Sequence, residues 1–139
     1  MTKTFDKELE VKLVQLKKSY CRYKLNIKRK HLNFGGIAHG GVITSLCDIS
    51  LAGAINHSLN NDEWCVTAEL NVNFLYPVFL GETIFGYGRL IKKGATLAFV
   101  EGGIENKEKK QIAKASGIWV VKSRRRAAIN SGSTTKALG

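Results

Sequence analysis

Apolar residues recur at every second position over much of the chain. They alternate with polar and charged side chains between residues 11 and 27, with an interruption at residues 17–19. The same period of two returns at residues 66–74, and three further stretches, 83–91, 97–105 and 111–121, are candidates for the same structure. Alternation of this kind is typical of half-buried strands, so we expect two strands before residue 28 and four after residue 65.

The stretch at residues 66–74 shows the alternation most clearly. One face is expected to carry Val66, Ala68, Leu70, Val72 and Phe74, and the other face Thr67, Glu69, Asn71 and Asn73. Between the first two and the last four strands, residues 40–59 contain no proline and one charged residue, Asp48, and are apolar on nearly every side. This pattern predicts a central helix enclosed by protein. One long helix among strands, without repeated strand–helix alternation, indicates an antiparallel α+β domain.

Small and polar residues share one stripe of this predicted helix. The stripe consists of Gly41, Thr44, Ser45, Asp48 and Ala52. Small side chains at this spacing allow a ligand or a partner chain to come close to the helix.

The chain has 139 residues and a net charge of +11. This length suits one domain, which we place at residues 1–122, followed by a basic and flexible tail at residues 123–139. Basic residues concentrate in the first thirty positions and after residue 106, around an acidic centre. Such a distribution favours a polyanionic partner, either nucleic acid or a phosphate-bearing cofactor.

Several classes of protein do not fit the sequence. No apolar run approaches the roughly 20 residues that a membrane span needs, so we expect no membrane association. The first residues lack the apolar stretch of a secretory signal, and the three cysteines are widely spaced, so we expect reduced thiols and a cytoplasmic location. The three histidines show no spacing typical of metal ligands, and no metal is expected.

The segment from His31 to Gly41 reads HLNFGGIAHGG, and Asp48 follows it on the predicted helix. Here the chain resembles the PaaI-like acyl-CoA thioesterases of the hot-dog fold, whose signature is H-x-N-x-x-G-x-x-H-G-G with a carboxylate eight residues beyond the first glycine of the pair. The resemblance continues through residues 71–82 and 92–99 and covers roughly residues 9–121. At the N-terminus the chain departs from the family, because the residues before the first strand are too few for the usual leading helix. The resemblance implies an antiparallel sheet wrapped around one central helix, and hydrolysis of a thioester to a free acid and coenzyme A.

The motif residues fit this chemistry. A helix N-terminus presents unpaired backbone amides, and glycines at 40 and 41 allow a thioester carbonyl to approach them. Asn33 could add a contact through its side-chain amide. An ionised carboxylate on an apolar helix needs a partner. Asp48 is either a structural carboxylate that is hydrogen-bonded to local backbone or to a serine, or a general base that activates water, or a nucleophile. The resemblance implies the catalytic role for Asp48 and a water-orienting hydroxyl at Thr67.

The spacing within the motif has a structural consequence. Gly40 and Asp48 are eight residues apart, which is about 12 Å along a helix. One thioester carbon cannot lie within about 3 Å of both an oxyanion donor and an attacking group at that separation. The site therefore requires Gly40 of one chain and Asp48 of another. We expect a homodimer, and a dimer of dimers (a homotetramer).

The remaining site predictions concern the binding of acyl-CoA, which is the expected partner. Coenzyme A is part of this substrate, and no other cofactor is expected. The resemblance places the turn at residues 92–96 beside the coenzyme A arm, and the basic residues that follow the last strand could pair with the nucleotide phosphates. The residues predicted to bind substrate or coenzyme A are His39, Gly41, Phe74, Lys92, Lys93, Gly94, Ala95, Thr96, Lys122 and Arg124.

Three other functions are alternatives to hydrolysis. A hydratase or dehydratase on the same fold could pair His39 with Asp48, but the motif spacing and Asn33 fit the thioesterase pattern better. A non-catalytic domain could bind acyl-CoA as a sensor. A nucleic-acid binder could use the basic ends, but no helix-turn-helix is evident and we do not expect this partner.

Overall fold

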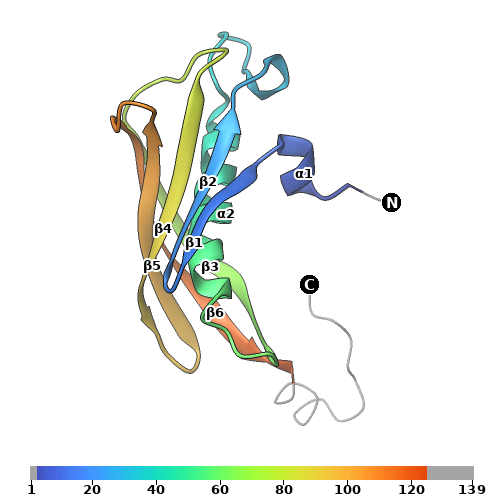
Figure 1. The fold of residues 1–139 in the computed structure, drawn as a ribbon, viewed down its shortest axis with the longest axis vertical. Helices are drawn as coiled ribbons and strands as arrows, with labels where there is room; N and C mark the ends of the chain where they lie inside the picture. Colours follow the sequence, from blue (N-terminus) through green and yellow to red (C-terminus); the bar gives the residue numbers. More distant parts are fainter. Residues whose placement is uncertain (1–2, 125–139) are drawn as a thin grey trace.

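A single antiparallel sheet wraps around helix α2 (Gly40–Asn56), as Figure 1 shows. The computed structural model describes residues 3–124, so the tail predicted at 123–139 lies outside the described residues beyond Arg124. The strands are β1 (Lys12–Lys17), β2 (Tyr20–Asn26), β3 (Glu63–Phe74), β4 (Thr83–Lys93), β5 (Leu97–Asn106) and β6 (Gln111–Ser123). Their order in the sheet is β1-β2-β4-β5-β6-β3, which makes β1 and β3 the edges. The α+β architecture expected from the sequence is confirmed.

Two short helices and the end of α2 complete the described chain. Helix α1 (Phe5–Leu9) precedes β1, and the 3-10 helix η1 (Arg29–His31) follows β2. Helix α2 ends at Asn56 rather than at the predicted Leu59, because Ser58 N–H donates to the Ile55 carbonyl at 2.7 Å and closes a turn there. None of the helices within residues 3–124 combines the length and apolarity needed to cross a bilayer.

The core lies between α2 and the inner face of the sheet, where it includes Leu46, Leu51 and Trp119. On β4, two glycines allow the helix to lie close to the strand. A Cβ atom added at Gly88 would lie 2.5 Å from the Ser50 carbonyl oxygen and 2.9 Å from the Leu51 Cα. Both of these are backbone atoms, so a side chain at Gly88 can be accommodated only if α2 itself moves.

Replacing Gly88 with alanine is therefore expected to lower the free energy of unfolding by about 3 kcal/mol, because the methyl group overlaps the α2 backbone. Urea denaturation checks this against Gly40→Ala, whose new methyl group lies 3.7 Å from its nearest neighbour. Equal midpoints for the two variants would show that the helix and the strand are not in close contact.

Strand β3 differs from the simple alternation predicted for it. Its pairing with β6 shifts between Thr67 and Glu69, which leaves Ala68 as an extra residue, a β-bulge. Before the bulge, Thr67 contacts α2, and after it Leu70 and Val72 pack against the core. The prediction that Thr67 lies on the face opposite to Leu70, Val72 and Phe74 is therefore wrong. The bulge turns Thr67 onto the helix face and leaves Val66 on the outer face.

Candidate active site

The segment before α2 is held in place by His31. Its ring is buried, accepts the Lys28 N–H at Nδ1 (2.9 Å) and donates from Nε2 to the Leu9 carbonyl (2.9 Å). Its backbone carbonyl accepts the His39 N–H at 2.8 Å. His31 thus ties α1 and η1 to the residue that begins α2. This role of His31 is not evident from local sequence patterns, and the H-x-N motif that contains the residue is the one signal that points to it.

His39 is the N-cap of α2. Its Nδ1 accepts the Gly41 N–H at 2.8 Å, which fixes the neutral ring with its proton on Nε2. A Cβ at Gly41 would lie 3.0 Å from this nitrogen, so glycine leaves room for the cap. The Gly41 amide is therefore used within the chain. The exposed Gly40 N–H has no acceptor within residues 3–124 and is the amide left for a ligand.

Asn33 precedes α2 in the sequence, and Phe74 follows it. The Asn33 Oδ1 accepts the Ile37 N–H at 3.2 Å and its own N–H donates to the Ile37 carbonyl at 2.8 Å, which closes the glycine-rich loop. The side-chain NH₂ of Asn33 has no acceptor within residues 3–124 and is available there as a donor. Phe74, at the end of β3, places its Cε1 3.7 Å from the position of a Cβ on Gly40. An aromatic ring thus borders the free amide, as expected if Phe74 contacts substrate.

Asp48 and Thr67 form the second half of the site. The Thr67 hydroxyl donates to Asp48 Oδ1 at 2.8 Å, from β3 to the middle of α2. The Asp48 side chain is half-buried, and its Oδ2 has no hydrogen-bond partner within residues 3–124. A carboxylate oriented by one hydroxyl, with its other oxygen available, can accept a proton from a bound water.

Two cysteines flank Asp48 without competing for its role. Burial raises the pKa of the Cys47 thiol to about 12, and the Asp48 charge adds to this effect. Burial and the same charge also raise the pKa of Cys65, whose Sγ lies 3.5 Å from Asn56 Oδ1. Both side chains therefore remain thiols near neutral pH, and a thiolate nucleophile is not available at this position.

The two halves of the site are separated within one chain. Gly40 lies beside Phe74 and Asp48 lies beside Thr67, so the two pairs lie at different positions along both α2 and β3. Eight residues of helix correspond to about 12 Å. One chain thus brings Asp48 together with Thr67, and Gly40 together with Phe74, but it does not bring the two pairs together.

The predicted coenzyme A residues gather at the other end of the sheet. The β4–β5 turn contacts the end of β6, where Val121 N–H donates to the Thr96 carbonyl at 2.8 Å. Lys93 pairs with Glu63 at 3.1 Å, and the Asn60 N–H, then Lys93, lowers the pKa of that carboxyl. Lys92 and Lys122 are exposed and form no ion pair within the described chain.

Two other predicted residues at this end form backbone hydrogen bonds, one within the β4–β5 turn and one just after β6. Gly94 N–H donates to the Leu97 carbonyl at 2.7 Å, and Arg124 N–H to the Asp62 carbonyl at 2.8 Å; Ala95 is exposed. The charge of Lys93 is thus already neutralised by Glu63. Lys92, Lys122 and Arg124 present their charges to solvent.

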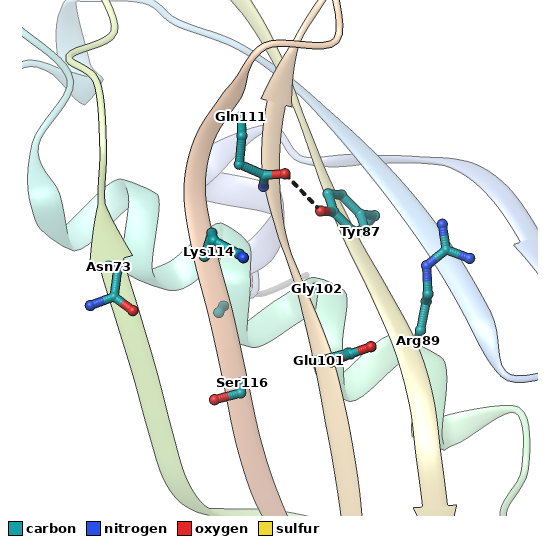
Figure 2. Close-up of a pocket in the computed structure, with 9 residues that line it drawn as sticks. Asn73, Tyr87, Arg89, Glu101, Gly102, Gln111, Lys114 and Ser116 are labelled. Carbon is teal, nitrogen blue, oxygen red and sulfur yellow. Dashed lines mark hydrogen bonds between the residues drawn. The ribbon is translucent and has the colours of Figure 1, made fainter.

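A cavity of about 500 Å³ lies on the outer face of the sheet (Figure 2). Residues such as Tyr87, Arg89, Glu101 and Lys114 line it, and none of the predicted site residues does. The predicted chemistry and this cavity are therefore on different faces of the sheet. Within residues 3–124 the structure shows no group of three or more metal-ligating side chains.

Comparisons with known proteins identify the family to which the chain belongs. A family model described as "Thioesterase superfamily" matches residues 35–113. A Saccharolobus solfataricus protein provisionally named an esterase is 34% identical over 83% of this chain and 81% of its own length. Mouse acyl-coenzyme A thioesterase 13 is 29% identical over 74% of each chain.

Solved structures share the fold. The PaaI protein of the E. coli phenylacetic acid degradation operon superposes with a TM-score of 0.76 at 23% identity, over 83% of this chain and 81% of that one. The smu.793 protein of Streptococcus mutans, bound to acetyl CoA, gives a TM-score of 0.73 at 30% identity, over 81% and 89%. The predicted hot-dog fold is confirmed.

Proposed function

Because the chain belongs to the thioesterase superfamily, we propose that it hydrolyses an acyl-CoA thioester to a free carboxylic acid and coenzyme A. The observation that carries this proposal is the hydrogen bond from Thr67 of β3 to Asp48 of α2, together with the free Gly40 amide at the start of α2. The acetyl CoA held by the smu.793 protein supports an acyl-CoA ligand.

In the proposed reaction Asp48 acts as the general base. Its Oδ2 removes a proton from water while the water oxygen attacks the thioester carbon. The Thr67 hydroxyl, which donates to Oδ1, fixes the carboxylate and offers its lone pairs to the same water. When the C–S bond breaks, the proton on Asp48 passes to the departing thiolate and yields the free thiol.

The Gly40 amide supplies the oxyanion site. It lies at the positive end of a 17-residue helix, where an N–H without a partner stabilises the charge that develops on the carbonyl oxygen. The Asn33 NH₂ is the candidate second donor. The Phe74 ring borders this position.

A complete site requires two chains. Strand β3 is a 12-residue edge strand with an unpaired side, and Phe74, Leu75 and Tyr76 at its end are exposed. A long edge with exposed apolar residues favours pairing with another chain. Antiparallel pairing of two β3 edges about a two-fold axis runs the two α2 helices in opposite directions and brings Gly40 of one chain toward Asp48 of the other.

Coenzyme A is proposed to lie with its phosphates at the basic end of the sheet. Lys92, Lys122 and Arg124 are exposed there and can pair with the nucleotide phosphates. Lys93 contributes less than predicted from the sequence, since Glu63 already pairs with it.

Removing the Thr67 hydroxyl is expected to lower kcat roughly tenfold, because Asp48 and its water lose one fixed contact. The variant is Thr67→Val, and Thr67→Ser, which keeps the hydroxyl, is the matched control. Thiol release from acyl-CoA, followed with a chromogenic reagent, measures both. Equal rates for Thr67→Val and the wild type would remove Thr67 from the mechanism.

A panel of short, long and aromatic acyl-CoAs tests the function itself. The proposal expects thiol release from at least one of them, with one acid formed per thiol. Binding of coenzyme A derivatives without release would instead make the protein a non-catalytic acyl-CoA-binding domain.

A further inference from the structure

Strand β1 is the edge of the sheet opposite to β3, and it is exposed along its whole length (Figure 1). Leu16 of β1 pairs with Cys21 of β2, which faces α2, since a Cβ at Gly53 of the helix would lie 2.5 Å from its Sγ. Leu13 pairs with Tyr23, which faces the helix in the same way. Leu13 and Leu16 therefore lie on the α2 side of the sheet, but the helix does not cover them, and they are 50% and 42% exposed.

A third apolar residue, Val14, lies between these two leucines. The pairing of β1 with β2 shifts between Leu13 and Gln15, which makes Val14 a β-bulge, and its side chain is 51% exposed. A bulge on an edge strand opposes the addition of another strand there. Leu13, Val14 and Leu16, termed the β1 patch below, are therefore not explained as a site for strand pairing.

Lysines flank the β1 patch on both sides. Lys12 precedes it, Lys17 follows it on β1, and Lys18 lies in the turn to β2. Lys12 also pairs across the strands with Lys24 of β2, and two like charges directly opposite each other destabilise a sheet. These four lysines form no ion pair within residues 3–124. The hairpin thus carries uncompensated positive charge beside exposed aliphatic side chains.

Acidic residues near the hairpin do not offset this charge. None occurs between Glu10 and Asp48 in the sequence, and Glu10 is itself paired with two lysines of the segment after β2. Glu105 pairs with an arginine of β2. Asp6 of α1 acts on the Tyr23 side chain, which lies away from the lysines of the turn. A partner for this surface must therefore be anionic and must also accept apolar side chains.

We propose that the β1 patch and its flanking lysines bind the surface of an anionic lipid bilayer. The lysines pair with the lipid phosphates, and the three aliphatic side chains enter the boundary between headgroups and acyl chains. Basic and apolar residues on one surface are the usual composition of such an interfacial site. A contact of this kind needs no spanning segment, and the length of the apolar runs, from which no membrane association was expected, does not bear on it.

Other occupants match this surface less well. A second copy of the hairpin would bring lysine against lysine, with no acid of the β1 patch to compensate. A nucleic acid would use the lysines but would leave the three aliphatic side chains in water. The β3 edge, which the proposed active site requires, lies at the other end of the strand order, so lipid binding and dimer formation use different edges.

Flotation of the full chain with lipid vesicles tests the charged part of the proposal. The wild type is expected to bind vesicles of phosphatidylglycerol and phosphatidylcholine, and not vesicles of phosphatidylcholine alone. Lys17→Gln/Lys18→Gln should lower the partition coefficient about 30-fold, because each lysine near an anionic surface contributes about fivefold. Lys107→Gln/Lys109→Gln, the same charge change in the exposed β5–β6 turn, is the control and should bind as the wild type does.

A second variant tests the apolar part. Val14→Thr/Leu16→Gln keeps every charge and should lower the same partition coefficient about tenfold, because less apolar surface enters the bilayer. Wild-type binding by either this variant or the Lys17→Gln/Lys18→Gln variant would overturn the proposal. Binding to a single-stranded oligonucleotide in place of the vesicles would assign the lysines to nucleic acid and also overturn it.

Thiol release without vesicles separates this proposal from the proposed function. Both double variants should keep the wild-type rate and the wild-type circular dichroism spectrum, because the hairpin lies at the edge opposite to β3. Vesicle binding in a protein that releases no thiol would support the lipid site and contradict only the proposed hydrolysis.

Discussion

Replacement of Asp48 by asparagine is expected to lower kcat for thioester hydrolysis about 10³-fold, within the range that a general base contributes. Asparagine has the shape of aspartate, and its side-chain oxygen can still accept the Thr67 hydroxyl that lies 2.8 Å away. What it lacks is a basic oxygen in the position of Oδ2. The loss should therefore fall on kcat, with little change in KM, and can be measured by thiol release under saturating acyl-CoA.

The control for Asp48→Asn is Glu108→Gln, which removes one negative charge from an exposed turn away from α2. It should retain wild-type kcat. Both variants should keep the wild-type circular dichroism spectrum, since Asp48 is half-buried and its replacement keeps the same volume. An Asp48→Asn variant that turns over within tenfold of the wild type would make Asp48 a structural carboxylate.

Replacement of Gly40 by proline is expected to lower kcat about 10²–10³-fold, the usual effect of losing one oxyanion donor. Gly40 is the first residue of α2, where proline is well tolerated because that N–H has no partner in the helix. The preceding residue, His39, already has the extended backbone that proline requires, with φ −61° and ψ 138°. Proline thus removes the donor and leaves the helix in place.

Gly40→Ala is the matched control for the proline variant. It keeps the N–H, and its methyl group meets Phe74 at an ordinary contact distance of 3.7 Å. We expect the alanine variant to lose far less activity than the proline variant, with similar melting temperatures for both. If the two variants lose the same activity, the Gly40 amide is not the oxyanion donor.

The sequence predicted the elements of this fold because its local pattern is consistent with its tertiary structure. In strand β6 the buried side chains alternate from Ala113 to Val121, with Trp119 and Val121 inside, and the apolar stretch that forms α2 is covered by the sheet. The bulge in β3 could not be predicted, because Val66 to Phe74 alternates without any break. Only the pairing with β6, more than 40 residues away in the chain, shows that Ala68 is an extra residue.

The sequence predicted the residues of the candidate site, but not all of the contacts that they make. The motif identified Gly40 and Asp48, and the helix rise placed them too far apart for one chain to form a site. The sequence did not predict the His39 cap on Gly41, because histidine is an uncommon N-cap and the His39 backbone is held by a hydrogen bond to the carbonyl of His31, eight residues earlier. The Lys93–Glu63 ion pair joins residues 30 positions apart, which no local pattern reveals.

In the proposed mechanism each active site takes Gly40 from one chain and Asp48 from another. Co-expression of Asp48→Asn and Gly40→Pro chains tests this sharing, because each variant alone is expected to be nearly inactive. In an equal mixture half of the dimers are mixed, and each mixed dimer contains one intact site out of two. We therefore expect about a quarter of wild-type thiol release. Release no greater than that of the separate variants would contradict the shared site and place both residues in the same chain's chemistry.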